Sequence, residues 1–283
     1  MGVIYIRGEY PEAISITQEA IDELHKQGLL GQQILGSGFN YNFKVIGAQG
    51  AYICGEETAL LSSIEGQRPE VRVRPPYPVQ QGLFNKPTVV NNVETLACIP
   101  WIIKNGGAQF ASIGIGRSTG TKLISLDGYF NKPGMYEVDM GTPLSVVVNE
   151  LGAGFRSPVK AMHIGGPLGG LVPVEKINDL TVDFESFSKN GFLLGHASVV
   201  CLPENFPIVK YLEHLFQFTA HESCGKCFPC RIGSTRGAEM LKKAQESDYK
   251  SDSYRIDRAL FNDLIETLEI GSLCALGGGL PLP

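Results

Sequence analysis

The sequence predicts a mixed α/β chain of three parts: an α/β domain over residues 1–115, a small β-grasp domain over 116–203 and a helical bundle over 204–283. Strand and helix patterns alternate in the first part. Short strand patterns with turns between them dominate the second part, and apolar stripes at helical spacing mark the third. The length of 283 residues is enough for a separate core in each part.

The α/β part begins with a strand-like run at residues 3–6, followed by a helix that Pro11 opens and Gly28 closes. A second strand at 43–46 leads through a glycine-rich turn into a helical run at 59–64. Strand, glycine turn and helix in this order are typical of a Rossmann-like nucleotide site. The glycines let a ligand approach the backbone, and the helix start offers unpaired amides.

Polar side chains mark two helix starts in this part. Glu56 and Glu57 precede the helical run at 59–64, where carboxylates can also simply complement the helix dipole. After a Pro- and Gly-rich surface loop, Asn91 and Glu94 have the spacing of a capping box, and a helix to about residue 105 follows. The adjacent Asn91 and Asn92 could therefore be a cap and a turn, or could bind a polar ring.

The second part predicts a hairpin from strands at 121–126 and 134–138, then a short helix and strands at 159–164 and 197–202. This hairpin, helix and strand order suits a small β-grasp domain. His163 and His196 sit among apolar residues there. Histidines in such positions are more often packed or hydrogen-bonded core residues than ligands.

The third part predicts two helices with apolar faces. Pro207 opens the first helix, and Gly271 ends the second one just before Cys274. Both stripes are typical of a bundle core. If they pack together, they bring Cys274 toward the cysteines that follow the first helix.

Cys224, Cys227 and Cys230 are separated by two residues each. A single zinc ion is usually held by two separated cysteine pairs, whereas three thiolates so close together suit a 4Fe-4S cluster with several iron corners. Cys274 is the expected fourth ligand, because it precedes the flexible glycine-rich run at 275–279. Zinc stays open as the alternative metal.

The other three cysteines, Cys54, Cys98 and Cys201, lie in apolar runs that predict buried strands or helices. Disulfides are not expected, because seven cysteines is an odd number and no signal peptide is evident. We also expect a cytoplasmic protein, because no signal peptide is evident. The net charge of −5 gives no reason to expect nucleic acid, and no apolar run approaches the roughly 18 residues of a membrane helix.

Five stretches together carry a family resemblance. In chain order they are GAYICGEETAL (50–60), RPPYP (74–78), NNVET (91–95), ESCGKCFPCR (222–231) and SLCALG (272–277). The chain resembles, nearly end to end, the NADH-oxidising flavoprotein subunit of respiratory complex I and its relatives. Three further stretches, HIGGPLGGL (163–171), GHAS (195–198) and FTAH (218–221), are most similar to the diaphorase subunit of bidirectional NAD-reducing nickel-iron hydrogenases.

The resemblance implies an FMN that lies across the α/β domain, with NADH stacked on it. The positions that match the family's FMN contacts are Tyr52, Gly55, Glu56, Glu57, Val90, Asn91, Asn92 and Thr95. The aromatic and basic residues that the family uses beside NADH correspond to Tyr77 and Arg74. Glu57 is the expected catalytic residue, as a carboxylate beside the hydride path.

The resemblance further implies an NADH dehydrogenase, or diaphorase, subunit that exchanges electrons between NAD(H), FMN and a 4Fe-4S cluster. Other iron-sulfur subunits of a hydrogenase or a complex I-like assembly would be its partners. Two alternatives stay open from the residues themselves: a zinc-stabilised binding module, and a flavin-free 4Fe-4S scaffold that only relays electrons.

The chain departs from the family pattern at both ends. In the family, a glycine-rich loop that cradles the flavin phosphate and an acidic loop precede the strand that corresponds to residues 3–6, and neither stretch occurs here. The sequence also stops soon after Cys274. We therefore expect an N- and C-terminally incomplete member, in which half of the phosphate-binding surface is missing.

Overall fold

The computed structural model describes residues 1–48, 50–246 and 255–283. They form two compact units, Met1–Val89 and Val90–Pro283, each of which combines helices with strands. Three short helices, α4 (Val93–Ala97), α5 (Ile99–Asn105) and α6 (Gly107–Ala111), fall in the second unit. The sequence places the same residues at the end of the first predicted domain.

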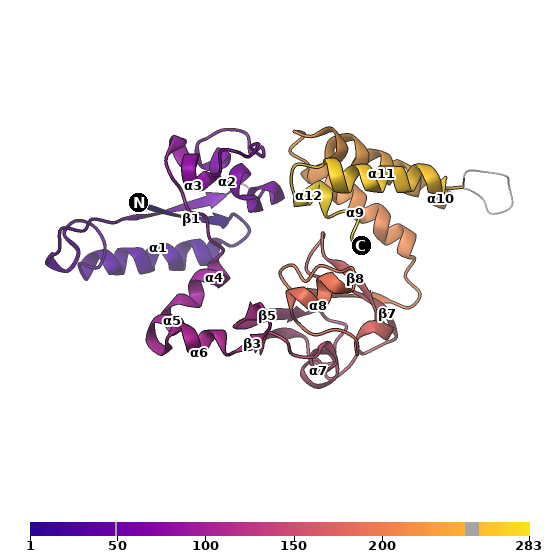
Figure 1. Ribbon diagram of the computed structural model, residues 1–283, viewed down its shortest axis with the longest axis horizontal. Coiled ribbons are helices and arrows are strands. Elements are labelled where there is room, and N and C mark those ends of the chain that lie inside the picture. Colours follow the sequence, from indigo (N-terminus) through magenta and orange to yellow (C-terminus); the bar gives the residue numbers. More distant parts are fainter. Residues whose placement is uncertain (49, 247–254) are drawn as a thin grey trace. The chain divides into compact units, whose positions relative to one another are not determined.

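The first unit is built on two parallel strands, β1 (Gly2–Arg7) and β2 (Phe43–Ala48), with α1 (Pro11–Lys26) between them in the chain (Figure 1). Pro occupies the first helical turn of α1, where a missing N–H costs nothing. Gly28 follows the helix with a φ of +70°, which only glycine adopts readily. The predicted strand, helix and strand are confirmed.

Four short elements complete the first unit. They are the 3-10 turn η2 (Tyr52–Gly55), helix α2 (Glu57–Ile64), helix α3 (Pro78–Gln81) and the turn η3 (Leu83–Asn85). The predicted helix is confirmed as α2 and begins two residues earlier than its apolar pattern, because Glu56 caps it. Gln49 of the glycine-rich turn lies outside the described residues.

A five-stranded sheet is the centre of the second unit. Its strands are β5 (Thr121–Leu126), β6 (Gly134–Asp139), β7 (Val159–Ile164), β8 (Gly170–Pro173) and β9 (Ser198–Pro203). They lie in the order β6-β5-β9-β7-β8, in which only the β5–β9 pair is parallel. The predicted hairpin is β5–β6, and strand β8 is an addition that its Gly- and Pro-containing sequence does not predict.

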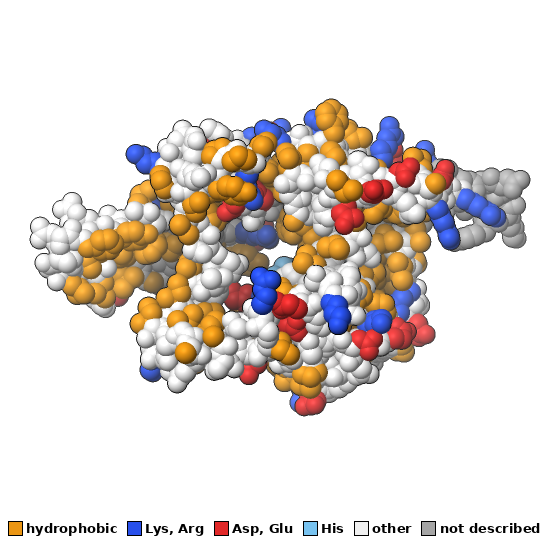
Figure 2. Space-filling model, viewed as in Figure 1, with side chains coloured by type: hydrophobic (Ala, Val, Ile, Leu, Met, Phe, Trp, Pro, Cys, Tyr) orange, Lys and Arg blue, Asp and Glu red, His pale blue; other side chains and the backbone are white. Residues whose placement is uncertain are grey.

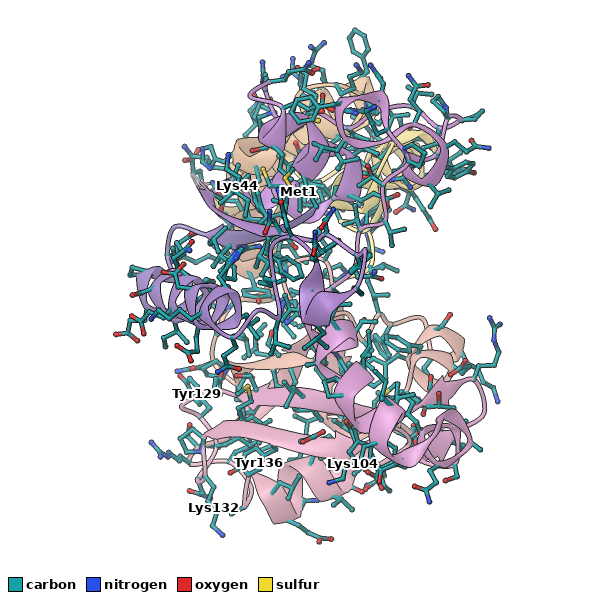
Figure 3. The ribbon with its side chains drawn as sticks, turned by 90° about the vertical axis from the view of Figure 1, so that its left-hand side faces the viewer. Met1, Lys44, Lys104, Tyr129, Lys132 and Tyr136 are labelled. Atoms are coloured by element: carbon teal, nitrogen blue, oxygen red, sulfur yellow. The ribbon has the colours of Figure 1, made fainter. Side chains whose placement is uncertain are left out.

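Small elements surround this sheet. They are the short pair β3 (Gly114–Ile115) and β4 (Ser118–Thr119), helix α7 (Leu144–Val146) with the π-helical turn η4 (Val147–Leu151), the turn η5 (Val174–Lys176) and helix α8 (Phe184–Lys189). Phe130, Val147 and Phe187 are completely buried against the sheet. In the β5–β6 hairpin, Tyr136 Oη donates to the Lys132 carbonyl at 3.0 Å (Figure 3).

The last part of the chain is helical: α9 (Ile208–Glu222), the π-helical turn η6 (Pro229–Gly233), α10 (Ser234–Glu246), α11 (Arg258–Gly271) and α12 (Ala275–Gly278). The predicted apolar stripes of α9 and α11 form a core around Leu215, Phe216 and Leu268. Helix α10 lies beside α9 (Figure 1). A Cβ on Gly237 would stand 2.0 Å from the Phe216 ring, so only glycine allows this close packing.

Apolar side chains are also exposed on α4 and α5, among them Val93, Leu96 and Ile103. Figure 2 shows hydrophobic side chains on the surface of this part of the chain. These helices therefore add apolar surface rather than core to the second unit. None of the described helices combines the length and the apolar character that crossing a bilayer requires.

Candidate functional site

The predicted cluster cysteines converge in the helical part. Cys224 and Cys227 lie in the loop after α9, Cys230 lies in the turn η6, and Cys274 is the residue that precedes α12. The η6 turn contacts both α11 and α12. The packing of these elements therefore brings a cysteine 44 positions further along the chain to the other three.

The pKa of Cys230 is affected by the other three cysteines. Burial raises the pKa of this thiol to about 11, a hydrogen bond to Ser223 opposes the rise, and the charges of Cys227, Cys274 and Cys224 add to it. Four neighbouring thiolates repel one another. A bound cation that ligates them removes this repulsion, so the site favours a metal centre over four separate thiolates.

The four cysteines do not form a site for a single metal ion in the described structure. Among the described residues, no three His, Cys, Asp or Glu side chains lie close enough to share one metal ion. The sulfurs of a zinc site stand about 3.8 Å apart, because each is about 2.3 Å from the ion at a tetrahedral angle. The charges of the other three cysteines nevertheless act on Cys230.

Two glycines shape the backbone around the cysteines. Gly225 adopts a φ of +79° directly after Cys224, which turns the loop. A Cβ on Gly277 would stand 2.8 Å from the Cys230 Cβ, so glycine lets α12 approach η6 closely. Arg231 extends over the Phe228 ring at 4.8 Å and donates to the Gly225 carbonyl at 3.3 Å, which keeps one positive charge beside the loop.

The predicted flavin carboxylates lie in the first unit. Glu56 caps α2 by accepting from the N–H groups of Thr58 and Ala59, each at 2.9 Å. Its other oxygen pairs with the Arg74 guanidinium, whose Nη2 also lies 3.1 Å from Glu57 Oε1. The structure therefore brings Glu56, Glu57 and Arg74 together. The sequence left open whether these carboxylates only stabilise the start of the helix. In the described structure Glu56 has this role, as the N-cap of α2.

A buried hydroxyl fixes the loop that carries Arg74. Thr58 Oγ1 donates to Glu56 Oε2 at 2.5 Å and accepts from the Arg72 N–H at 2.8 Å. Arg72 in turn pairs with Glu65 at 2.7 Å. The sequence does not predict this tie between α2 and the loop, because it depends on a contact across 14 residues.

The other predicted ligand residues of the first unit are Tyr52, Gly55 and Tyr77. A Cβ added to Gly55 would meet no atom within 4 Å, so its face is open to a ligand. Arg7 stacks over the Tyr52 ring at 5.6 Å. Tyr77, at the start of α3, is 52% exposed.

The asparagine motif lies in the second unit. Asn92 is the cap of α4 and accepts from the Glu94 N–H at 2.7 Å. The predicted cap at Asn91 is therefore wrong by one residue. Asn91 and Thr95 are exposed and Val90 is half-buried. The FMN-matching positions thus fall on both compact units.

An ion pair that the sequence does not reveal ties α4 to the sheet. Glu94 pairs with the buried Lys122 of β5 and also accepts from the Leu123 N–H at 3.1 Å. Burial alone would raise the pKa of Glu94. The hydrogen bonds from Lys122 and Leu123, with the charges of Lys122 and His196, outweigh it and lower the pKa below the ordinary 4.5.

This pair predicts a pH dependence of stability. Because the pKa of Glu94 is lowered by folding, its contribution is present above the ordinary pKa and is lost as pH falls through the lowered value. We expect Glu94→Gln to lower the free energy of unfolding by about 1 kcal/mol at neutral pH, as measured by urea unfolding. On acidification, this variant should lose less stability than the wild type. The control is Glu137→Gln, which removes the charge of an exposed carboxylate that accepts a hydrogen bond from Thr121. Equal acid sensitivity of wild type and Glu94→Gln would contradict this role.

The two histidines that the sequence places in a core differ in burial. His163 is buried, as predicted, with Nδ1 2.6 Å from Tyr211 Oη and Nε2 3.2 Å from the Gly169 carbonyl. Burial lowers the pKa of His163, and the Gly169 hydrogen bond opposes this effect while the charge of His196 adds to it. Burial also raises the pKa of Tyr211 to about 12. The prediction of a core position is wrong for His196, which is exposed in a turn.

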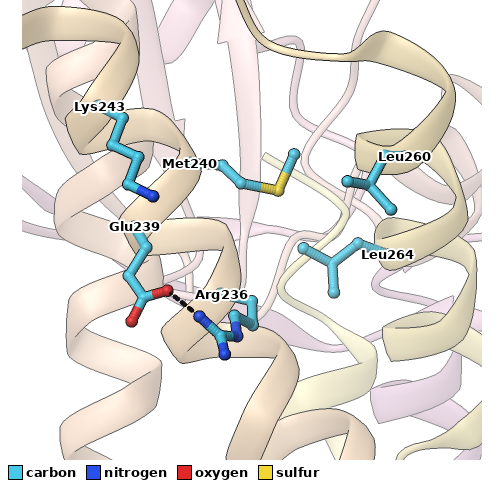
Figure 4. A pocket seen from close by; sticks show the side chains of 6 residues that line it. All are labelled: Arg236, Glu239, Met240, Lys243, Leu260 and Leu264. Atoms are coloured by element: carbon cyan, nitrogen blue, oxygen red, sulfur yellow. Dashed lines mark hydrogen bonds and ion pairs between the residues drawn. The ribbon is translucent and has the colours of Figure 1, made fainter. Parts of the chain in front are cut away.

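The described part of the chain also contains a cavity of about 300 Å³ between α10 and α11 (Figure 4). Its lining residues are Arg236, Glu239, Met240, Lys243, Leu260 and Leu264. None of the predicted site residues is among them. The cavity therefore shares no residue with the cysteine site or with the glutamate site.

Comparison with known proteins assigns both ends of the chain. Residues 1–101 match the family described as the Nuo51 FMN-binding domain, and residues 210–283 match the NADH-ubiquinone oxidoreductase-F iron-sulfur binding region. The matches cover the glutamate site and all four cysteines. They agree with the cofactors that the sequence predicts, FMN and an iron-sulfur cluster.

Several curated relatives are similar over almost the whole chain. The NADP-reducing hydrogenase subunit HndC of Solidesulfovibrio fructosivorans is 41% identical over 100% of this chain and 57% of its own length. The F 2 subunit of NADH-quinone oxidoreductase from Rhizobium meliloti is 42% identical over 98% of this chain and 65% of its own. The chain therefore spans about three fifths of the length of these relatives.

A solved structure and a third relative complete the comparison. The NAD+-reducing NiFe-hydrogenase in the H2-reduced state superposes with a TM-score of 0.86 and 32% identity, over 99% of this chain and 46% of that chain. The F subunit of NADH-quinone oxidoreductase from Rickettsia bellii is 38% identical over 99% of this chain and 67% of its own length. The chain therefore belongs to the family formed by the F subunits of NADH-quinone oxidoreductases and their hydrogenase relatives.

Proposed function

We propose that this chain passes electrons between NAD(H), FMN and a 4Fe-4S cluster as the diaphorase subunit of a larger redox assembly. The observation that carries the proposal is the convergence of Cys224, Cys227, Cys230 and Cys274 at one end of the helical part. When bound, FMN accepts a hydride from the nicotinamide and releases electrons one at a time, and a 4Fe-4S cluster accepts them singly.

The four cysteines are the ligands that we propose for the cluster. Their charges act on one another, while the described residues do not gather three ligands around a single ion. The two-residue separation of Cys224, Cys227 and Cys230, with the match to an iron-sulfur binding region, supports a centre with several iron atoms over the alternative of one zinc ion. Arg231, held beside the loop by Phe228 and the Gly225 carbonyl, partly offsets the negative charge of the ligands.

The chain's own residues fit a flavin in the first unit. Gly55 leaves open space where a side chain would stand, and the two carboxylates beside it are held by Arg74. We propose that Tyr52, Gly55, Glu56 and Glu57 face the flavin. Val90, Asn91, Asn92 and Thr95 are the further flavin-binding residues that we propose, and Arg74 with Tyr77 is proposed to bind the dinucleotide.

We infer three domains with the predicted bounds: 1–115 for FMN and NADH, 116–203 as a β-grasp domain and 204–283 for the cluster. The strand order β6-β5-β9-β7-β8 supports the β-grasp assignment. Strands β5 and β9, which come first and last of the five in the chain, are parallel neighbours within the sheet. The names of the relatives describe them as subunits of a hydrogenase and of NADH-quinone oxidoreductase. We therefore propose partner subunits that carry further iron-sulfur clusters, and a cytoplasmic location.

The proposed function is tested on anaerobically purified chain supplied with FMN. Iron and zinc analysis with visible spectroscopy identifies the metal, and NADH-dependent reduction of ferricyanide reports the flavin reaction. We expect an iron-sulfur spectrum and FMN-dependent activity. A colourless protein with one zinc per chain would overturn the cluster, and a cluster-bearing chain that binds no FMN would reduce the function to electron relay.

The proposed role of Glu57 predicts a kinetic change. Glu57→Gln removes a negative charge beside the hydride path and one partner of Arg74, which lies 3.1 Å away. We expect the KM for NADH to rise about 5- to 10-fold, equivalent to about 1 kcal/mol of binding, and the flavin potential to shift upward.

The matched control for this prediction is Glu65→Gln. It breaks a 2.7 Å ion pair with Arg72 at the far end of the same helix, so it tests whether any lost ion pair on α2 has the same effect. We expect an unchanged KM and flavin potential in this control. If Glu57→Gln also left both quantities unchanged, Glu57 would have no part in the reaction.

A further inference from the structure

A buried hydroxyl without a partner stands beside the cysteine site. Ser272, in the turn between α11 and α12, has an Oγ that is buried and makes no hydrogen bond within the described part of the chain. A buried hydroxyl without a partner costs folding free energy, so an unpaired one in a native fold requires an explanation. A ligand atom that accepts a hydrogen bond from this hydroxyl would provide one.

The position of this hydroxyl is known from its neighbours. A Cβ built on Gly277 would stand 2.3 Å from Ser272 Oγ and 2.8 Å from Cys230 Cβ. Both atoms are therefore close to the same point and to each other. Any side chain at Gly277 would clash with both atoms, so glycine lets the serine hydroxyl and the cysteine pack closely against α12.

A second serine touches the same cysteine. Ser223, directly before Cys224, has its Oγ 3.3 Å from Cys230 Sγ, which is a sulfur hydrogen bond. In the protonated thiol the sulfur donates this bond. A ligating cysteine carries no proton, so the hydroxyl of Ser223 must rotate and become the donor, as a serine hydroxyl readily does.

We propose that Ser223 and Ser272 donate hydrogen bonds to the sulfur of Cys230, or to the cluster sulfur next to it, and that they tune the cluster's reduction potential. The inference rests on the proposed 4Fe-4S cluster and adds two residues that no cysteine pattern reveals. Donors to ligand sulfur withdraw negative charge and stabilise the reduced cluster more than the oxidised one. The two serines therefore raise the potential.

This arrangement places three hydroxyl contacts on one residue. Ser234 Oγ also bonds to Cys230, but to its backbone carbonyl at 2.5 Å and not to its sulfur. Ser234 is completely buried, so its hydroxyl is as well shielded as that of Ser272. It provides a matched control with the same substitution at the same cysteine.

The test is a redox titration of the anaerobically purified, FMN-loaded chain, followed by electron paramagnetic resonance of the reduced cluster. The variants are Ser272→Ala, Ser223→Ala, their combination and the control Ser234→Ala. We expect each of the first two to shift the midpoint potential to more negative values, and the double variant to shift it further. The control should keep the wild-type potential.

Resonance Raman spectra of the same samples supply an independent measurement. Transfer to D2O should shift the Fe–S(Cys) stretching bands of the wild type, because the donated protons exchange. Ser272→Ala should lose part of this shift, whereas Ser234→Ala should keep all of it.

The outcomes separate the two proposals. If the wild-type chain holds no iron-sulfur cluster, the proposed function fails first. If the wild type holds the cluster and Ser272→Ala has the wild-type potential and the wild-type D2O shift, the serine inference is overturned. Loss of the cluster from Ser272→Ala would also overturn it, because a tuning hydrogen bond changes the potential and not the occupancy.

Discussion

Replacing Cys274 by alanine is expected to remove most of the iron from the anaerobically purified chain. The wild type should carry about four iron atoms per chain, because a 4Fe-4S cluster needs four protein ligands. With only Cys224, Cys227 and Cys230 left, one iron corner loses its thiolate. Iron analysis and the signal of the reduced cluster in electron paramagnetic resonance measure the result.

A cysteine outside the site gives the matched control. Cys98 is half-buried like Cys274, and its thiol donates to the Glu94 carbonyl at 3.3 Å. Cys98→Ala should keep the iron content and the signal of the wild type. If Cys274→Ala also retained its iron, the fourth ligand would have to be another residue, and the proposed site would be wrong at that position.

Replacing Leu268 by alanine is expected to destabilise the helical part by about 2–5 kcal/mol, because it leaves a cavity at a fully buried position. Leu268 is 0% exposed and belongs to the core with Leu215 and Phe216. It also packs against the η6 turn, since a Cβ on Gly233 would stand 3.1 Å from Leu268 Cδ2. We expect the cluster to be lost at a lower urea concentration, in parallel with the helical circular dichroism.

The same helix provides the control for this prediction. Leu260→Ala removes the same atoms from α11 at a position that is 56% exposed. Its cost should stay below about 1 kcal/mol, because the leucine is already partly in water. Equal urea midpoints for the two variants would show that Leu268 does not hold α11 against the turn that carries Cys230.

Local patterns predicted most of the longer elements. Pro11 and Gly28 mark α1, the apolar stripes mark α9 and α11, and alternating residues mark the β5–β6 hairpin. Helices α8 and α10, strand β8 and several shorter elements escaped prediction. Helix α10 has few apolar positions, and it packs through Gly237 as well as through the buried Met240 and Leu241.

The candidate site could also be predicted only in part. The spacing of three cysteines is a local property, and so is the presence of two glutamates at a helix start. The partners of these residues are not local. Arg74 reaches Glu56 across 18 residues, and Lys122 reaches Glu94 across 28. No periodicity or spacing rule encodes such pairs, because their geometry depends on how separate elements pack.

The sequence by itself determined the family resemblance, the order of the longer predicted elements and the residues that can ligate a cluster, because these depend on residue type and short spacing. Only the tertiary structure decided that Cys274 stands beside Cys230, that Glu56 caps α2 while Arg74 holds it, and that Ser272 places an unpaired hydroxyl at the cysteine site. The physical reason is that burial and hydrogen bonding at a site depend on neighbours from distant parts of the chain, which the packing of helices and strands brings together.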